Sequence, residues 1–545
     1  TVNMTDGSVT VTEGSSGVYS VIDVGSSAGS VGDFNQSGGS ITMNGVGNLH
    51  VGTFGGTGTF SMSGDASFAM NGDGSFGGTF YIGTGVGADA TVNFSDNATF
   101  VQNDDVQTFI ADSGATAVFN QDGIGSNVTW EGDTGNNDRP FWVGGGTGGT
   151  GTYNLEAGNL TFSDLVVSFG REAGSEGILN QSGGTLTAGG DNTTKNSVAI
   201  GGSGTGSYNM SDGTAAFNEG LTLAAAGGST GTVNQTGGTV TIGAGEDLRF
   251  GSGTGTYNLD GGTLEVAGTN GIQGGSGASL VNLGGGTLRA TGNLDIDSNV
   301  DVNVTANSTV DTDAHTATYD GDLGGTATLA KTGTGTLSLG GSGSSASISV
   351  NDGTLTGMGA TSGDITVSVG ATLAGALSAG GTTTIESGGT HTPGFSPSAS
   401  YSAGNYDLMS GGTLVIELGG ATEGTGSYTS PVTGDFDQLL YGGDITLESG
   451  VTLEFASTNA FTPGLNDTFD ILFTDQTIDL QTFTGSGTGL LAGYTFGLSV
   501  VANEGYGSSS NPHAVRATVT AVPDPTSLIF LLARRLTLYL RRRAS

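Results

Sequence analysis

A phrase that begins with Asn returns through the first three hundred residues and constrains the fold more than any other feature of this chain. It reads Asn-Gln-Ser-Gly-Gly-Thr-Leu-Thr from Asn180 and recurs in similar form from Asn234, Asn258 and Asn282. The steps between these residues are 54, 24 and 24, and the first divides into 29 and 25 at Asn209. Repetition at such a period is typical of one small supersecondary unit stacked on itself.

Each copy of the phrase predicts a tight turn followed by a half-buried strand. Pairs such as Asp212-Gly213 tolerate positive φ and turn the chain sharply. In residues 239–242, Val and Ile then alternate with Thr, which indicates a strand with one apolar face. A further short apolar segment follows in the better copies, as in Leu248–Phe250. Two or three short strands cannot bury a face alone, so neighbouring repeats must stack.

Two architectures fit this pattern: a parallel β-solenoid with one coil per repeat, and a string of hairpins with Gly-Gly as a primed turn. The period and the third segment favour the solenoid. We therefore expect an all-β parallel β-helix of about eleven repeats of 24–34 residues over residues 1–319. Asn180, Asn234, Asn258 and Asn282 would then lie above one another and form a ladder of amide hydrogen bonds. The alternative is that Asn serves only as a turn residue.

The composition limits the range of functions. The chain has 545 residues, with 106 Gly, 8 Pro and no Cys. Residues 1–521 carry 7 basic and 49 acidic side chains (net −42), residues 522–545 carry 5 and 1 (net +4), and the total is −38. An acidic body of this kind repels nucleic acid, so nucleic-acid binding is excluded.

The amino-acid sequence of the repeat changes after about residue 320. Leu329–Leu339 and Val350–Leu355 resemble the autotransporter-associated repeat of secreted β-helical passenger proteins, which implies such a repeat over residues 320–391. Residues 392–521 are less repetitive and contain a Pro-Gly-Phe-Ser-Pro turn that resembles the closing region of the same class. We expect this segment to be a less regular β region that caps the open end of the solenoid.

Residues 522–545 form a distinct tail with a Pro-acid-Pro turn, an apolar stretch and a terminal arginine cluster. This tail resembles the PEP-CTERM sorting signal of Gram-negative bacteria that make exopolysaccharide. The residues that carry the resemblance are Pro523, Asp524, Pro525, Arg541, Arg542 and Arg543. The resemblance implies export, recognition by an exosortase-type membrane protein and removal of the tail. Two departures weaken it: Asp524 replaces the usual Glu, and two further arginines interrupt the apolar stretch. The alternative is a basic amphipathic tail without a sorting role.

No established metal motif is present. Four histidines (His50, His315, His391 and His513) lie far apart in a chain without Cys, which argues against a zinc site. The acidic segment 295–303 lacks the Gly and the Glu of an EF-hand loop. Alternation would place Asp295, Asp297 and Asp301 on one strand face. We interpret that face as solvated, with weak surface calcium binding as the alternative, and expect no other cofactor.

β-Solenoids also host polysaccharide lyases and glycosidases. A lyase needs basic residues, for which the candidates here are Lys195, Arg249, Arg289 and Lys331. A glycosidase needs two carboxylates that flank a cleft, and no pair stands out among the 50 acidic residues. We therefore expect no enzyme and name no catalytic residue.

The sequence predicts an exported acidic β-solenoid with a structural, adhesive or extracellular-matrix role at the cell surface of a Gram-negative bacterium. Its expected partners are the sorting machinery, extracellular polysaccharide or other surface proteins, and further copies of itself. Two alternatives stay open: a polysaccharide-active enzyme on the same scaffold, and a self-assembling extracellular filament subunit.

Overall fold

The structure of the chain is a computed structural model. It describes residues 1–12, 20–72, 78–103, 106–132, 140–189, 197–268, 271–394, 399–427, 430–481, 484–487, 491–502 and 513–523. Within these ranges the regular elements are β-strands, and no α-helix occurs. The chain divides into two compact units, an N-terminal unit (Thr1–Gly321) and a C-terminal unit (Asp322–Ser545).

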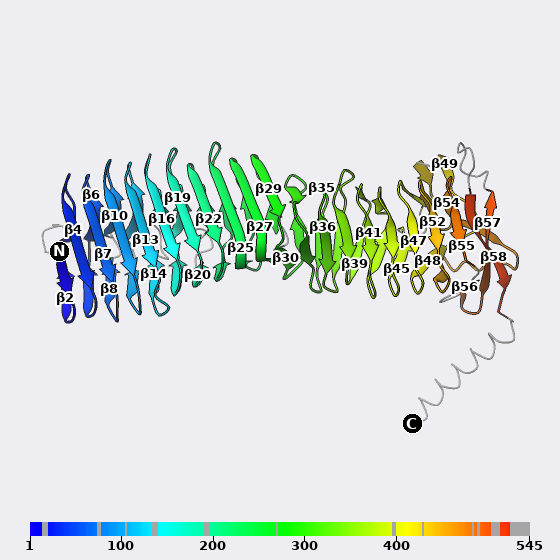
Figure 1. Ribbon diagram of the computed structural model, residues 1–545, viewed down its shortest axis with the longest axis horizontal. Helices are drawn as coiled ribbons and strands as arrows, with labels where there is room; N and C mark the ends of the chain where they lie inside the picture. The colour runs from blue at the N-terminus through cyan, green and yellow to red at the C-terminus, as the bar shows by residue number, and fades with distance from the viewer. Residues whose placement is uncertain are drawn as a thin grey trace, which may run out of the picture. The chain divides into compact units, whose positions relative to one another are not determined.

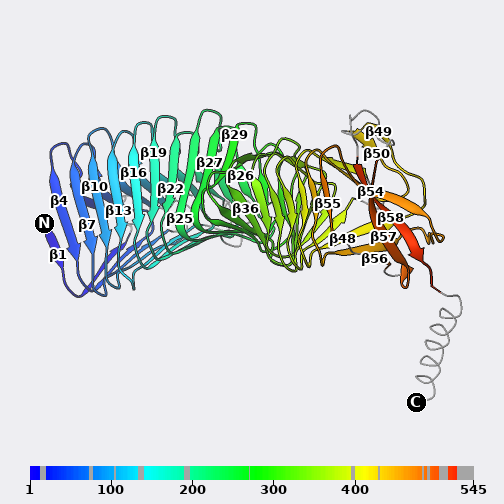
Figure 2. The same cartoon turned by 45° about the vertical axis from the view of Figure 1, so that its right-hand side comes forward.

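Each coil of the N-terminal unit contains three strands in succession. Every strand pairs in parallel with the corresponding strand of the next coil, as β10 (Asp89–Phe94) does with β13 (Thr116–Gln121) (Figures 1 and 2). This is a parallel β-helix, as predicted. The hairpin alternative is wrong, because the pairing is parallel and joins strands of different coils.

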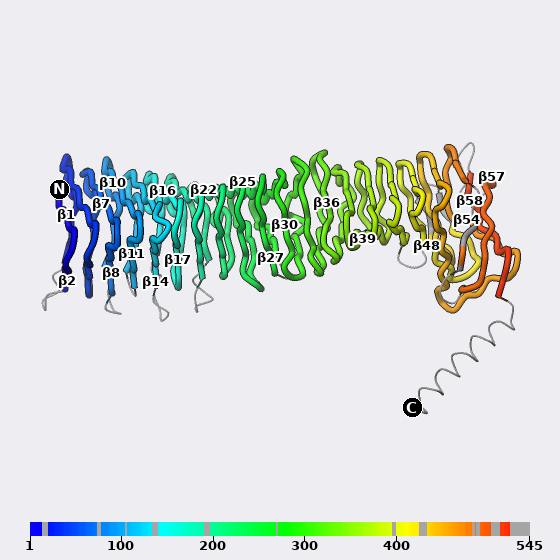
Figure 3. The backbone as a smooth tube through the Cα atoms, turned by 60° about the horizontal axis from the view of Figure 1, so that its bottom comes forward, coloured from blue at the N-terminus to red at the C-terminus, as the bar shows by residue number. Residues whose placement is uncertain are grey.

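The first strands are β1 (Val2–Met4), β4 (Val31–Gln36), β7 (Thr57–Met62), β10, β13, β16 (Thr150–Leu155), β19 (Glu176–Gln181), β22 (Thr205–Met210), β25 (Thr230–Ile242), β27 (Thr254–Val266), β29 (Ala278–Leu283) and β32 (Asp301–Val304). The second strands are β2 (Ser8–Thr12), β5 (Ser40–Asn44), β8 (Ser67–Asn71), β11 (Thr99–Asn103), β14 (Asn127–Glu131), β17 (Asn159–Ser163), β20 (Thr185–Ala188), β23 (Thr214–Phe217), β30 (Thr287–Ala290) and β33 (Ser308–Asp311). In two coils the first and second strands are continuous, as β25 and β27. Figure 3 shows that the two strands of one coil, such as β10 and β11, follow one another along the same face.

The third strands form a separate sheet. They are β3 (Ser20–Val24), β6 (Gly47–Thr53), β9 (Thr79–Thr84), β12 (Gln107–Asp112), β15 (Pro140–Val143), β18 (Val166–Phe169), β21 (Val198–Ile200), β24 (Leu221–Leu223), β26 (Leu248–Phe250), β28 (Ile272–Gln273), β31 (Leu294–Ile296) and β34 (Thr316–Tyr319). A third strand thus completes each coil and closes the core on its remaining side.

In most strands the side chains alternate between the core and the surface. In β16, Gly151, Tyr153 and Leu155 point inward and are buried, whereas Thr150, Thr152 and Asn154 are half-buried on the outer face. The inward aromatic rings of successive coils stack along the axis, as Phe119 and Tyr153 do with centroids 4.6 Å apart. Each coil therefore contributes one layer of a continuous apolar core.

Glycine predominates at the corners that follow third strands, where Ala111 and Ala224 also adopt positive φ. Gly144 has a φ of +67°, a conformation that other residues rarely adopt. A Cβ atom there would also collide with the backbone carbonyl of Glu176 in the next coil. The high glycine content therefore reflects the close approach of backbones at stacked corners.

Coil length varies although the register does not. The steps between successive Asn residues of the first strands range from 21 residues (Asn282 to Asn303) to 34 residues (Asn120 to Asn154). Most of the difference lies between the second and third strands. In the longer coil, β14 ends at Glu131 and β15 begins at Pro140, whereas β17 ends at Ser163 and β18 begins at Val166 in the next coil.

The coils of the C-terminal unit are shorter, and Thr354, Thr372 and Thr390 align at steps of 18 residues. One parallel column contains β36 (Thr328–Thr332), β38 (Ser347–Val350), β41 (Ile365–Val367), β44 (Thr383–Ile385), β47 (Tyr406–Leu408), β52 (Ile445–Leu447) and β55 (Ile478–Leu480). A second contains β37 (Thr336–Leu339), β39 (Thr354–Gly357), β42 (Thr372–Gly375), β45 (Thr390–Pro393), β48 (Thr413–Leu418), β53 (Thr452–Ser457) and β56 (Thr484–Gly487). The remaining strands are β35 (Leu323–Gly325), β40 (Ala360–Thr361), β43 (Ser378–Ala379), β46 (Ala399–Ser402), β49 (Thr425–Ser427), β50 (Ser430–Val432), β51 (Gln438–Tyr441) and β54 (Thr468–Thr474).

Antiparallel pairing appears towards the end of the described chain. β58 (His513–Ala521) pairs with β54 and with β57 (Thr495–Ala502), which in turn pairs with β56. These antiparallel strands are the less regular β region that the sequence predicts. Parallel coils nevertheless continue as far as β55 and β56, well into residues 392–521.

Candidate functional site

The Asn residues of the first strands form a continuous ladder on the outer face of the N-terminal unit. One residue from each coil occupies the aligned position, and these residues are Asn3, Asn35, Ser61, Asn93, Asn120, Asn154, Asn180, Asn209, Asn234, Asn258, Asn282 and Asn303. From Asn120 to Asn282, each Nδ2 donates to the Oδ1 of the preceding coil over 2.8–2.9 Å. At the other end, Asn93 donates to Ser61 Oγ over 3.2 Å. We call the run from Ser61 to Asn282 the amide ladder; it brings together Asn180, Asn234, Asn258 and Asn282, with Asn209 between the first two.

A second set of amides lies inside the core and was missed by the sequence analysis. Gln181, which follows Asn180, is about 1% exposed, and its Oε1 accepts a hydrogen bond of 2.7 Å from the hydroxyl of Tyr208 in the next coil. Its Nε2 donates to the backbone carbonyl of Thr214 over 3.0 Å. Burial raises the pKa of Tyr208, so the hydroxyl stays protonated and donates.

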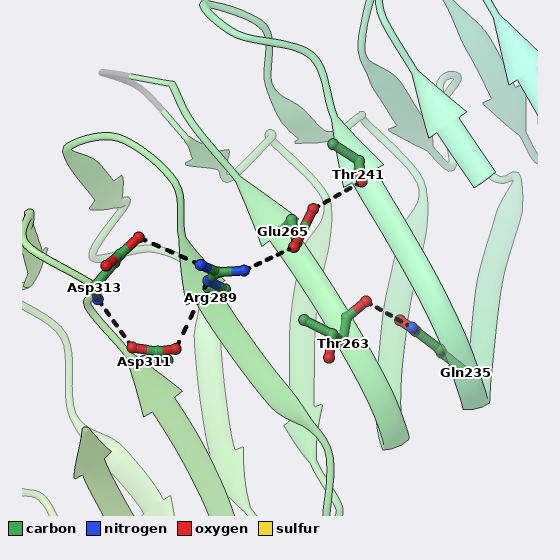
Figure 4. Close-up of polar contacts among 7 residues, drawn as sticks. All are labelled: Gln235, Thr241, Thr263, Glu265, Arg289, Asp311 and Asp313. Atoms are coloured by element: carbon green, nitrogen blue, oxygen red, sulfur yellow. Dashed lines mark hydrogen bonds and ion pairs between the residues drawn. The ribbon is translucent and has the colours of Figure 1, made fainter. Parts of the chain in front are cut away.

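The same arrangement recurs in two other coils. Gln121 Oε1 accepts from the Tyr153 hydroxyl over 2.8 Å, and Gln235 Oε1 accepts from the Tyr257 hydroxyl over 2.6 Å. Gln235 Nε2 also donates to the carbonyl of Thr263 over 2.9 Å (Figure 4). The signal in the sequence is a Gln directly after the ladder Asn, with a Tyr directly before the ladder Asn of the next coil.

Gln36 is the exception to this pairing. It occupies the same inward position, but the residue directly before the ladder position of the next coil is Phe60 rather than Tyr. Gln36 Oε1 is buried without a hydrogen-bond partner, while Nε2 donates to the carbonyls of Gly39 and Ser67. The missing hydroxyl of Phe60 accounts for the unsatisfied oxygen.

A charged row lies on the outer face of the second strands. Arg289 contacts three carboxylates: Glu265 at 3.3 Å, Asp313 at 3.3 Å and Asp311 at 3.7 Å (Figure 4). Thr241 extends the row by donating to Glu265 over 3.0 Å. Arg289 was a candidate for binding an anionic sugar, but its guanidinium is already neutralised by these acids.

Arg249 and Lys331, two further basic candidates, also form polar contacts within the chain. Arg249 contacts Asp247 at 3.0 Å and donates to Gln273 over 3.2 Å. Lys331 is fully buried, and its Nζ donates to the carbonyls of Thr332, Gly333 and Asp352 over 2.6–3.0 Å. Lys195 lies outside the described residues.

The single acidic strand face expected over residues 295–303 is wrong. β31 ends at Ile296, and the chain then turns, with the Val300 N–H donating to the Asp297 carbonyl over 3.0 Å. The next strand, β32, begins at Asp301. Asp, Ser and Asn at 297–299 favour a turn, and this preference overrides the alternation. Asp295 and Asp301 therefore belong to different strands.

Carboxylates gather near Asp295 without forming a metal site. Its pKa is raised by burial and by the charges of Asp297 and Asp320. Glu219 has a raised pKa for the same reasons, with Glu246 and Asp164 as its neighbours. Across the described ranges, no group of three or more His, Asp or Glu side chains is arranged to hold a metal ion.

An aromatic stack covers part of the third-strand sheet on its outer side. His50, Tyr81, Phe109 and Trp142 occupy aligned positions in consecutive coils, with ring centroids 5.1–5.5 Å apart. Arg171 lies over the Trp142 ring at 5.0 Å. Because the rings mainly cover one another, this stack reads as a stabilising feature rather than as a platform for sugars.

Of the residues of the predicted C-terminal sorting signal, the structure describes Pro523 alone. Pro523 ends the described chain, and Asp524, Pro525, Arg541, Arg542 and Arg543 lie outside the described residues. Among the residues that are described, no helix is long and apolar enough to span a membrane.

The repeated amide ladder and the buried Gln–Tyr pairs are thus the most distinctive side-chain arrangements of the N-terminal unit. Comparison of the sequence with models of known protein families and with curated proteins gives no match.

Proposed function

We propose that this chain is an exported structural β-solenoid with an adhesive or matrix role at the surface of a Gram-negative bacterium. The observation that carries the proposal is the amide ladder, which continues without a break from Ser61 to Asn282. It supports a role in which one surface group is presented many times at a fixed interval. Such a surface suits extended partners, namely polysaccharide, other surface proteins or further copies of the chain.

Export is proposed from the two resemblances in the sequence. Residues 320–391 resemble repeats of secreted passenger proteins, and residues 522–545 resemble a signal read by exosortase-type machinery. If the tail is a working signal, mass spectrometry of envelope-bound protein will find the chain without residues 522–545. Retention of the tail would contradict sorting by cleavage.

A role without catalysis is supported by the state of the basic candidates. Arg249 and Arg289 are neutralised by carboxylates, and the Lys331 ammonium is enclosed by backbone carbonyls. None of the three is poised to take a proton from a sugar or to neutralise its carboxylate. We propose no cofactor.

The test exposes the chain to a panel of acidic and neutral polysaccharides and measures co-sedimentation together with released sugar ends. Binding without release is the expected result. Released ends would replace the scaffold role with a polysaccharide-active enzyme. If neither is seen, electron microscopy at rising protein concentration tests the self-assembling filament, which would appear as rods of increasing length.

A further inference from the structure

An open groove borders the amide ladder on three consecutive coils, where β19, β22 and β25 turn towards the second strands. Its volume is about 340 Å³. Gln181 and Met210, both about 1% exposed, form its floor. The other lining residues are Asn180, Ser182, Asn209, Ser211, Asn234 and Thr236.

The ladder leaves part of the hydrogen-bonding capacity of its amides unused. Asn209 donates one N–H to Asn180 over 2.9 Å and accepts one bond from Asn234 over 2.8 Å. A primary amide offers two N–H donors and two lone pairs. Each half-buried ladder residue in the groove therefore retains one donor and one acceptor, repeated at the coil spacing of about 4.8 Å. The exposed hydroxyls of Ser182 and Ser211 lie beside them.

The charge and the strand pairing around the groove limit the kinds of ligand that it can bind. No lining residue carries a charge, and the net charge of −38 disfavours an anionic polymer. A peptide strand would need a free sheet edge, but β22 is paired on both sides, with β19 and with β25. What remains is an uncharged, hydroxyl-rich chain that repeats along the coil axis.

We propose that this groove binds a neutral polysaccharide laid along the stack of coils. The inference rests on the proposed adhesive role and adds its ligand class and its site. Hydroxyls of successive sugars accept from the remaining N–H groups of Asn180, Asn209 and Asn234 and donate to their remaining lone pairs. The C–H faces of the sugars pack on the carbon atoms of the groove wall. Contacts are few per coil, so affinity depends on several sugars being engaged together.

The test compares two matched substitutions. Asn209→Asp removes donors and adds a negative charge inside the groove. Asn71→Asp makes the same change outside both the groove and the amide ladder, because Asn71 lies on a second strand, where it donates to Asn44 and accepts from Asn103 over 2.9 Å. Binding of the full chain to a soluble neutral galactomannan is measured by affinity electrophoresis, with alginate as the acidic comparison. Asn209→Asp is expected to weaken galactomannan binding about tenfold, and Asn71→Asp to leave it unchanged.

A second variant keeps the test decisive if ladder substitutions impair folding. Ser182→Ala with Ser211→Ala removes two exposed hydroxyls without touching the ladder, and it is expected to weaken binding about threefold to tenfold. Equal binding by all variants, or equal loss in both Asn variants, would overturn the groove while leaving an adhesive role intact. Binding of alginate alone would overturn the neutral ligand class. An unmodified chain that binds neither polymer would contradict the adhesive role itself.

Discussion

The N-terminal and C-terminal units both consist of parallel coils, but they accommodate buried polar groups in opposite ways. In the N-terminal unit, buried polar side chains recur in several coils and bond to side chains of the next coil, as Gln181 and Tyr208 do. In the C-terminal unit, ionisable side chains are buried singly. Lys331 is surrounded by backbone carbonyls, His391 contacts one Tyr hydroxyl, and Asp470 holds one arginine.

This difference determines how much stability is lost when one buried polar contact is removed from either unit. A repeated contact can be lost at one coil while its neighbours remain, because each coil interacts only with adjacent coils. A single buried charge has no equivalent elsewhere, so its loss leaves an uncompensated partner. We therefore expect substitutions in the C-terminal unit to cost more than matched substitutions in the ladder.

The strongest test breaks the ion pair between Asp470 and Arg516. Asp470 is about 1% exposed and accepts two bonds from the guanidinium, of 2.6 and 2.7 Å. Asp470→Asn is expected to lower the free energy of unfolding by about 3 kcal/mol, towards the low end for a buried pair because Arg516 is partly exposed. Urea denaturation measures this change. Asp247→Asn, at the pair with the exposed Arg249, should cost less than about 1 kcal/mol, and an equal cost at both sites would contradict the comparison.

The Gln–Tyr pair provides a double-mutant cycle in the N-terminal unit. Gln181→Leu leaves the buried Tyr208 hydroxyl without its acceptor, and Tyr208→Phe leaves Gln181 Oε1 without its donor. Each single change is expected to cost about 2 kcal/mol, and the double change less than their sum, since an apolar pair leaves fewer buried polar groups unsatisfied. Thermal denaturation of the four proteins measures the coupling. Strict additivity would show that the bond does not stabilise the coil.

His391 makes the stability of the C-terminal unit depend on pH. Burial lowers its pKa from 6.5 to about 3 in the folded chain. The unfolded chain therefore takes up the proton first, and stability is complete above pH 6.5 and declines as the pH falls towards 3. At pH 5 the loss is about 2 kcal/mol. His391→Gln keeps a partner for Tyr406 and removes the titration, so its denaturation midpoint should fall less between pH 7 and pH 5; an unchanged pH dependence would contradict this assignment.

The smallest effect is expected from the substitution that supplies a hydrogen-bond donor to Gln36. Phe60→Tyr supplies a hydroxyl to the unsatisfied Gln36 Oε1 and should raise the free energy of unfolding by about 1 kcal/mol. Phe119→Tyr is the matched control: Phe119 occupies the same inward position as Phe60, but the residue that takes the place of Gln36 in its preceding coil is Phe94, which cannot accept a hydrogen bond through its side chain. That change is expected to destabilise the chain by about 2 kcal/mol. A gain at both positions would refute the pairing rule.

The sequence predicts the solenoid and the aligned Asn positions well, for a simple reason. Where parallel coils pair without a register shift, spacing along the chain maps directly onto contacts between coils, so the steps around Asn209 identify residues that lie in contact. The acidic segment from Asp295 to Asn303 shows the limit of that reasoning. The alternating pattern predicts one continuous strand there, but residues 297–300 form a turn. The turn preference of Asp, Ser and Asn is stronger than the alternation at this point.

Other features could not be predicted from the spacing. The Gln–Tyr pairs join positions two residues apart in the repeat, so the sequence does not connect the two residues until the register is known. The aromatic stack from His50 to Trp142 lies on third strands, which follow connections of unequal length. Without a constant spacing, nothing in the sequence aligns these rings.

The ladder positions stay aligned although the coils vary from 21 to 34 residues, and this has a consequence for how such a chain changes in length. Extra residues enter mainly between the second and third strands and leave the amide ladder in place. Closing a longer connection costs little, about 0.6 kcal/mol for each doubling of its length. This corner is therefore where foreign peptides could be grafted onto successive coils, displayed in a row at the spacing of the stack, without redesigning the core.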